Sequence, residues 1–204
     1  MSSTGDRDRL VRQARRLSQL SLGWHLLEAA LAIAAGAVAG SIALTGFGAD
    51  SLIEAAAGLV VIWLMSARRA GSPEAERRAQ QLIAASFLLL AIYIAAQSAR
   101  DLIGSQHPAI SWPGIALAAI TLLAMPPLAH AKRRVGEALG SHATTSEGRQ
   151  NLLCAYLSAA LLVGLLANAL AGWWWADPAV AIAIGAVAIR EAHSAWRGDS
   201  CDCC

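Results

Sequence analysis

The chain has 204 residues, of which 56% are hydrophobic and only 15% are charged, where about 25% is usual in a soluble domain. This composition excludes an ordinary soluble globule and favours a protein whose partner is the lipid bilayer. Sixteen Lys and Arg against fourteen Asp and Glu leave a formal charge of +2, too small for a nucleic-acid-binding surface, so no nucleic acid is expected as a partner. The four cysteines do not suggest a disulfide framework.

Six apolar stretches follow one another along the chain, and each is long enough to cross a bilayer as a helix of about 20 residues. They lie near residues 20–39, 42–65, 80–103, 112–131, 150–170 and 173–193. Pro126 and Pro127 are expected to kink or end the fourth helix. The sequence therefore predicts an all-α integral membrane protein with six transmembrane helices and both termini on one side.

Basic residues are distributed unevenly across the predicted loops. One side receives fifteen of the sixteen: Arg7, Arg9, Arg12, Arg15, Arg16, Arg68, Arg69, Arg77, Arg78, Lys132, Arg133, Arg134, Arg149, Arg190 and Arg197. Only Arg100 falls on the other side. Because cytoplasmic loops are rich in Lys and Arg, both termini are expected in the cytoplasm, in a multi-pass protein of the cell (plasma or inner) membrane.

The same pattern predicts three parts. Residues 1–17 form a basic cytoplasmic segment, residues 18–197 the six-helix transmembrane domain, and residues 198–204 a Cys-rich cytoplasmic tail. The tail thiols Cys201, Cys203 and Cys204 suit a soft cation, so the tail is expected to capture metal at the inner mouth. The alternative is a disordered tail with incidental thiols.

Three acidic side chains fall inside predicted membrane helices, where each carboxylate opposes insertion by about 2.5–3.5 kcal/mol. Glu28 lies in the first helix, and Asp50 and Glu54 lie four residues apart on one face of the second. Two carboxylates so close and away from water cannot both be ionised, so the pair tends to hold a proton or a divalent cation. No basic residue is expected at their depth. The alternative is a structural pair, hydrogen-bonded between helices or bound to Arg.

A second helix can contribute ligands to the same site. Glu147, Asn151 and Cys154 recur at i, i+4 and i+7 and share a face of the fifth helix. Glu147 has an alternative role as an ordinary acid at a helix start, and Cys154 as a small buried hydrophobe. Glu28 is a candidate ligand, proton carrier or partner of a polar group, whereas His25 is interpreted as a histidine at the membrane interface.

The second helix also carries a family resemblance. From Gly40 to Glu54 the chain reads Gly-Ser-Ile-Ala-Leu and then Asp50, three residues and Glu54. This run resembles the second membrane helix of the cation diffusion facilitators (cation efflux family), whose pattern is Gly-Ser-x-Ala-Leu, then His or Asp, three residues and Asp. The resemblance implies that Asp50 and Glu54 are metal ligands.

The fifth and sixth helices extend the resemblance. In the fifth, Asn151 falls on the family's first ligand and Glu147 on the acid four residues before it, but Ala155 falls where the final Asp belongs. The run from Trp175 to Pro178 looks like the family's Trp-x-Asp-Pro at the start of the sixth helix, where Asp177 is expected to be structural. The resemblance implies that Glu147 with Asn151, then Glu28, complete the site in place of residue 155, ahead of Cys154.

Over about residues 18–197 the chain resembles a short, divergent member that lacks the C-terminal cytoplasmic domain of most relatives. By this resemblance it is no enzyme and holds no prosthetic group. It is a divalent transition-metal exporter, a metal/proton antiporter that works by alternating access and forms a homodimer. Zn²⁺ is the first expected cargo, with Co²⁺, Cd²⁺, Mn²⁺ and Fe²⁺ as alternatives. The competing hypothesis is a non-transporting, metal-binding membrane regulator or scaffold protein.

Overall fold

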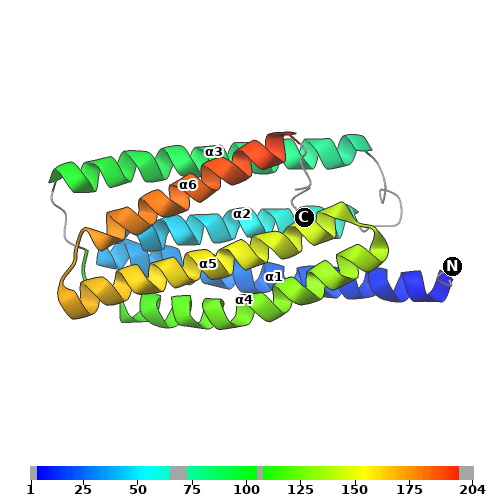
Figure 1. Cartoon of the computed structure of the whole chain (residues 1–204), viewed down its shortest axis with the longest axis horizontal. Helices are drawn as coiled ribbons and strands as arrows, with labels where there is room; N and C mark the ends of the chain where they lie inside the picture. The colour runs from blue at the N-terminus through cyan, green and yellow to red at the C-terminus, as the bar shows by residue number, and fades with distance from the viewer. Residues whose placement is uncertain (1–3, 65–72, 105–107, 198–204) are drawn as a thin grey trace.

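The structure, a computed structural model, describes residues 4–64, 73–104 and 108–197. Within these ranges it contains no strand and six α-helices (Figure 1). They are α1 (Thr4–Ala39), α2 (Ile42–Leu64), α3 (Pro73–Gly104), α4 (Trp112–Leu139), α5 (His142–Ala171) and α6 (Ala176–Arg197). The expected all-α fold is confirmed. The tail cysteines Cys201, Cys203 and Cys204 lie outside the described residues.

Four of the helices surround a common interior. α1 packs along α2 and α4 along α5, while α1 also contacts α4 and α2 contacts α5 (Figure 1). α3 and α6 pack on each other and against α2. Ile94 of α3 lies over Gly46 of α2 and Gly185 of α6, where an added Cβ would come within 3.2 and 3.3 Å of the isoleucine. Small residues therefore let the α3–α6 pair approach the bundle closely.

The outer surface of the helices is apolar. By length and composition, four helical segments can cross a membrane, Asp6–Ala39, Ile42–Val60, Trp112–Leu139 and Glu147–Ala171, and α3 contributes the shorter apolar stretch Phe87–Arg100. Large side chains such as Leu31, Leu123 and Leu170 are exposed on these helices. Such a surface fits the hydrocarbon of a bilayer, inside which helices satisfy their own backbone groups. The chain is a multi-pass membrane protein, and six crossings remain a prediction.

Several helices run beyond their apolar parts. α1 has 36 residues, about 54 Å at 1.5 Å per residue, which exceeds the roughly 30 Å of a hydrocarbon core. α4 continues through Pro126 and Pro127 to Leu139, so the alternative that these prolines end the helix is wrong. The reason lies in packing against α5: Cβ atoms added at Gly136 and Gly148 would come within 2.5 and 2.8 Å of side chains on the other helix.

This extension changes the predicted loop between the fourth and fifth helices. The connection is only a turn, in which Gly140 adopts φ +63° and Ser141 caps α5 by accepting a hydrogen bond from the Thr144 N–H. Lys132, assigned to this loop from sequence, lies on α4 and is fully buried. That assignment is wrong because α4 continues to Leu139, beyond the apolar run from which its end was predicted near residue 131.

Asp177 fastens the start of α6 to the start of α2. Its carboxylate accepts hydrogen bonds from the Ser41 hydroxyl and from the backbone N–H groups of Ile42 at 2.9 Å and Ala43 at 3.2 Å. The first N–H groups of a helix lack partners within the helix, so an acid placed there stabilises α2. The structural role predicted for Asp177 is confirmed.

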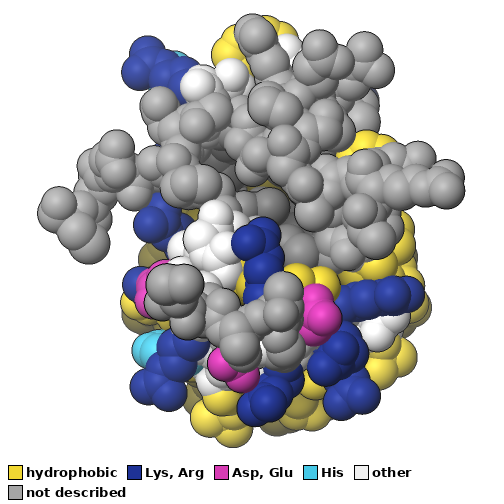
Figure 2. All heavy atoms as spheres, turned by 90° about the vertical axis from the view of Figure 1, so that its right-hand side faces the viewer, with side chains coloured by type: hydrophobic (Ala, Val, Ile, Leu, Met, Phe, Trp, Pro, Cys, Tyr) yellow, Lys and Arg dark blue, Asp and Glu magenta, His cyan; other side chains and the backbone are white. Residues whose placement is uncertain are grey.

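One end of the molecule is rich in basic side chains. Figure 2 shows the end at which α1 begins and at which the α4–α5 turn lies, with Lys and Arg gathered on it. Arg7, Arg9 and Arg12 are exposed in the first part of α1, and Arg134 is exposed near the end of α4. We call this end of the molecule the arginine-rich end. Its position in the cytoplasm is a prediction from the sequence.

Candidate metal centre

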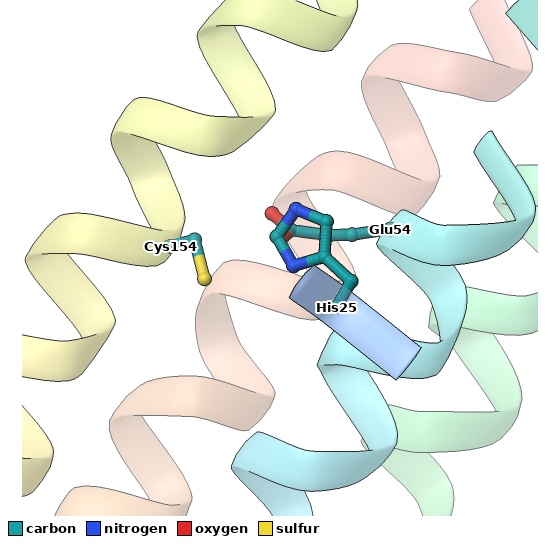
Figure 3. A group of neighbouring side chains, drawn as sticks. All are labelled: His25, Glu54 and Cys154. Carbon is teal, nitrogen blue, oxygen red and sulfur yellow. The ribbon is translucent and has the colours of Figure 1, made fainter. Parts of the chain in front are cut away.

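Three potential metal ligands from three helices meet inside the bundle. His25 of α1, Glu54 of α2 and Cys154 of α5 each offer one ligand atom, and these atoms lie within 4.8 Å of one another (Figure 3). The three side chains are 1%, 6% and 0% exposed. Imidazole nitrogen, carboxylate oxygen and thiolate sulfur are the donor types that zinc uses in proteins. We call these three residues the His-Glu-Cys cluster.

Glu54 has an unsatisfied atom in this cluster. Its buried Oε2 accepts no hydrogen bond from any group in the described part of the chain. The His25 Nδ1 atom lies 3.2 Å from it, an ion-pair distance, yet the contact lacks hydrogen-bond alignment. Leaving a buried carboxylate oxygen without a donor costs free energy. Glu54 is therefore placed to receive a cation or a proton.

Glu28 lies beside the cluster at the centre of a hydrogen-bond network. Its Oε2 accepts a bond from Ser51 on α2 at 3.0 Å and lies 3.3 Å from the His25 Nδ1 and 4.0 Å from the Cys154 sulfur. Its Oε1 accepts a bond from Thr121 on α4. Glu28 thus connects four helices and orients the histidine and cysteine of the cluster.

Asp50 adds a further carboxylate. It lies one turn before Glu54 on α2, is 5% exposed, and its charge acts on both Glu54 and Cys154. Three buried carboxylates, those of Glu28, Asp50 and Glu54, therefore lie near one another in the interior. Because carboxylates so close together and away from water cannot all be ionised alone, the arrangement favours a bound cation or protons.

A separate polar group lies next to the cluster. The ammonium group of Lys132 donates hydrogen bonds to Glu147 Oε1 at 2.6 Å, to the Ser21 hydroxyl at 2.6 Å and to Asn151 Oδ1 at 3.2 Å. The Ser18 hydroxyl donates to the other oxygen of Glu147 at 2.7 Å. We call these five residues the Lys132–Glu147 layer. It holds a buried ion pair whose donors and acceptors are well matched.

Asn151 joins the layer to the cluster. Its Oδ1 accepts the hydrogen bond from Lys132, while its Nδ2 lies 3.5 Å from His25 Nε2 and 3.4 Å from the Met125 sulfur. The two polar groups are therefore adjacent but distinct.

The residues predicted from sequence are divided between these two groups. Glu54 and Cys154 belong to the cluster, with Glu28 and Asp50 beside it, whereas Glu147 is bound to Lys132. Asn151 belongs to the layer and contacts His25 of the cluster. The ligand role of each residue stays a prediction.

Two residues were misplaced by sequence reasoning. His25, expected at the membrane interface, is buried beside Glu28 and Glu54, and its i, i+3 spacing from Glu28 was the available signal. Lys132 continues a buried face of α4 at helical spacing from Met125 and Ala129, and that pattern was the available signal.

Comparison with known proteins gives two matches. The sequence pattern described as the cation efflux transmembrane domain matches residues 18–197. The chain is also similar to a protein of Synechocystis sp. (strain ATCC 27184 / PCC 6803 / Kazusa) named "Uncharacterized transporter sll1263". The two are 25% identical over 183 residues, which make up 86% of this chain and 59% of the relative. The chain thus spans about three fifths of the length of this curated relative.

Proposed function

The chain belongs to the cation efflux family, and we propose that it carries a divalent metal cation across the membrane by binding it at the His-Glu-Cys cluster. One observation carries this proposal: three ligand types converge within 4.8 Å in the interior, where Glu54 keeps an oxygen free of hydrogen bonds. Ionisable groups at such depth are costly and usually mark an ion pathway.

Zinc is the cargo that the donor set favours. A nitrogen, a sulfur and an oxygen donor suit zinc, whereas magnesium and calcium prefer oxygen ligands alone. Co²⁺, Cd²⁺ and Fe²⁺ tolerate the same donors, and Mn²⁺ prefers more oxygen. Zinc commonly takes four ligands, and the carboxylates of Glu28 and Asp50 beside the cluster are candidates for the fourth. Glu147 ranks below them here because Lys132 already neutralises it.

Proton exchange follows from the same chemistry. Metal binding requires a neutral imidazole, a thiolate and ionised carboxylates, so an arriving cation displaces protons from the site. Protons that enter from the opposite side compete the metal off again. If the site opens alternately to the two faces, a proton gradient drives export from the cytoplasm. The homodimer implied by the family resemblance is part of this proposal.

The test is transport by purified protein in liposomes that contain a zinc-sensitive and a pH-sensitive dye. Wild type is expected to move zinc with opposite movement of protons. Asp50→Asn and Glu54→Gln each remove one negative charge at nearly constant size, so both should insert normally and lose zinc flux. Glu137→Gln is the matched control, because this acid on α4 is exposed.

Two outcomes would contradict the proposal. Equal zinc flux and equal dependence on the pH gradient in wild type and both amide variants would remove these acids from the transport site. Zinc binding by a correctly inserted wild type that moves no zinc would instead support the regulator or scaffold hypothesis.

A further inference from the structure

On each helix that contributes to both groups, the residues of the Lys132–Glu147 layer lie nearer the arginine-rich end than the residues of the His-Glu-Cys cluster. α1 and α5 begin at the arginine-rich end, and Ser18 and Ser21 precede His25 on α1 as Glu147 precedes Cys154 on α5 (Figure 1). The layer therefore lies on the arginine-rich side of the cluster.

The two helices that run the opposite way agree. α4 ends at the arginine-rich end, and Lys132 follows Thr121, the partner of Glu28. On α2, which also runs toward that end, Gly58 lies one turn beyond Glu54. A Cβ at Gly58 would lie 3.3 Å from Glu147 Oε1, so the α2 backbone lies directly against the layer.

Four helices thus meet around one buried ion pair between the cluster and the arginine-rich end. Lys132 is 0% and Glu147 3% exposed, and Ser18 and Ser21 are equally enclosed. A cation that moves along the interior of the bundle from this end meets the Lys132 ammonium before it reaches Glu54. The positive charge and the hydrogen bonds both oppose its passage.

The bonds of the layer are not equally strong. The ion pair connects α4 and α5, which are held tightly together where Gly148 leaves room for the backbone of Ala129. Among the described residues, the contacts to α1 include no ion pair: the Ser18 hydroxyl donates to Glu147, and the Ser21 hydroxyl accepts from Lys132 and donates to Glu147 at 3.4 Å. Asn151 adds the 3.5 Å contact between its Nδ2 and His25 Nε2. Separating a buried ion pair leaves two uncompensated charges in a low dielectric, whereas releasing the serine hydroxyl groups leaves the Lys132 and Glu147 charges paired with each other.

We propose that the Lys132–Glu147 layer is the gate that closes the metal cluster toward the arginine-rich end, and that it opens along the seam between α1 and the α4–α5 pair. In the open state the ion pair stays intact on α4 and α5 while Ser18 and Ser21 move away with α1. The metal-related part of this inference rests on the proposed function, but closure of the interior by the layer does not.

Cys154 provides a native reporter of access to the cluster. Replacing Cys201, Cys203 and Cys204 by Ser leaves it as the single thiol of the chain, and its side chain is fully buried. The full-length protein is placed in sealed vesicles of both orientations. A cationic, membrane-impermeant methanethiosulfonate reagent is then added outside, and the labelling rate of Cys154 is followed by mass spectrometry.

In this background Cys154 is expected to react slowly from both sides. The double variant Ser18→Ala/Ser21→Ala should react at least about five-fold faster, and only from the arginine-rich side, because the seam bonds are lost while the ion pair remains. Lys132→Met should do the same. Ser98→Ala is the matched control, since it removes a buried serine hydroxyl from α3, outside the layer, and should leave the rate unchanged.

An unchanged rate in the serine double variant, inserted and folded, would overturn the gate. So would faster labelling from the opposite side or from both sides, because that result indicates general loosening. If Lys132→Met fails to fold, the Ser18→Ala/Ser21→Ala variant still tests the gate, because it keeps the Lys132–Glu147 ion pair. Protection of Cys154 by added zinc tests the metal site separately: its absence would count against the proposed function and leave the gate result standing.

Discussion

At the scale of single residues, the cluster and the layer differ in how well the carboxylate oxygens of their acids are hydrogen-bonded. Glu54 is buried with an oxygen that lacks a donor, while Glu147 is surrounded by donors from Lys132 and Ser18. A carboxylate with satisfied oxygens contributes to stability, and one without them is held ready for a ligand. The two acids therefore have different expected consequences on substitution.

Cys154→Ser separates the sequence ranking from the structural one. The family resemblance placed Cys154 behind Glu147 and Glu28 and predicts little effect, whereas the cluster geometry favours Cys154 as a ligand. Because a hydroxyl is a far poorer zinc ligand than a thiolate, we expect zinc affinity to fall by more than about ten-fold, or about 1.4 kcal/mol. Isothermal titration of the purified protein measures this, in a background in which Cys201, Cys203 and Cys204 are replaced by Ser, so that only the Cys154 thiol differs between the two proteins. Unchanged affinity would restore the sequence ranking.

Lys132→Ala tests the buried ion pair as a stabilising element. Removal of one partner leaves the Glu147 carboxylate buried with its charge uncompensated, which costs about 3–5 kcal/mol in comparable pairs. We expect a clear fall in the thermal unfolding temperature in detergent. Lys132→Ala combined with Glu147→Ala should recover part of the loss, since no buried charge is left. A double variant less stable than the single one would show that the pair is not coupled.

At the scale of elements, caps and close helix contacts fix how the helices meet. The α1–α2 pair is joined where Gly36 would place a Cβ 2.5 Å from the Thr45 hydroxyl, and the α4–α5 pair is joined at Gly136 and Gly148. Asp177 attaches α6 to the start of α2. Because α2 carries Glu54, this contact also helps to position the His-Glu-Cys cluster.

Asp177→Ala is expected to lower stability by more than the roughly 0.5–2 kcal/mol of an ordinary helix cap, because one carboxylate satisfies two backbone N–H groups and a hydroxyl. Thermal unfolding in detergent reports the change. Asp6→Ala provides a control, since Asp6 is an exposed first-turn acid of α1. A shift no larger than that of the control would mean that the Asp177 contact contributes nothing measurable to the fold.

At the scale of the whole molecule, basic side chains gather at one end, and the helix surfaces between the two ends are apolar. The arginine-rich end gathers the start of α1 and the α4–α5 turn (Figure 2). Arg100, the basic residue that the sequence placed on the other side, lies exposed near the end of α3. Such asymmetry orients a multi-pass protein with its basic end in the cytoplasm.

A pair of topology reporters checks this orientation. A reporter fused after Cys204 should read out as cytoplasmic, and one inserted after Ala109, between α3 and α4, should read out on the opposite side. The basis is the preference of Lys and Arg for the cytoplasmic face. A cytoplasmic signal from both fusions, or an external signal from the first, would contradict six crossings with inside termini.

The sequence by itself determined the features that are set within a single helix. Apolar runs longer than a bilayer is thick specify a membrane protein, and the i, i+4 spacing puts Asp50 and Glu54 on one face whatever surrounds them. Helix ends were less predictable, because α1, α4 and α5 continue beyond the apolar residues that marked them.

Only the tertiary structure decided which residues meet across helices. His25 and Cys154 are 129 residues apart and join Glu54 because α1, α2 and α5 pack in one particular rotation and register. The same packing buries Lys132 against Glu147. From sequence, Lys132 was instead assigned to a loop with the neighbouring basic residues. Contacts within a helix follow from backbone geometry alone, whereas contacts between helices depend on the side chains and small residues that set how closely, and at what angle, the helices pack.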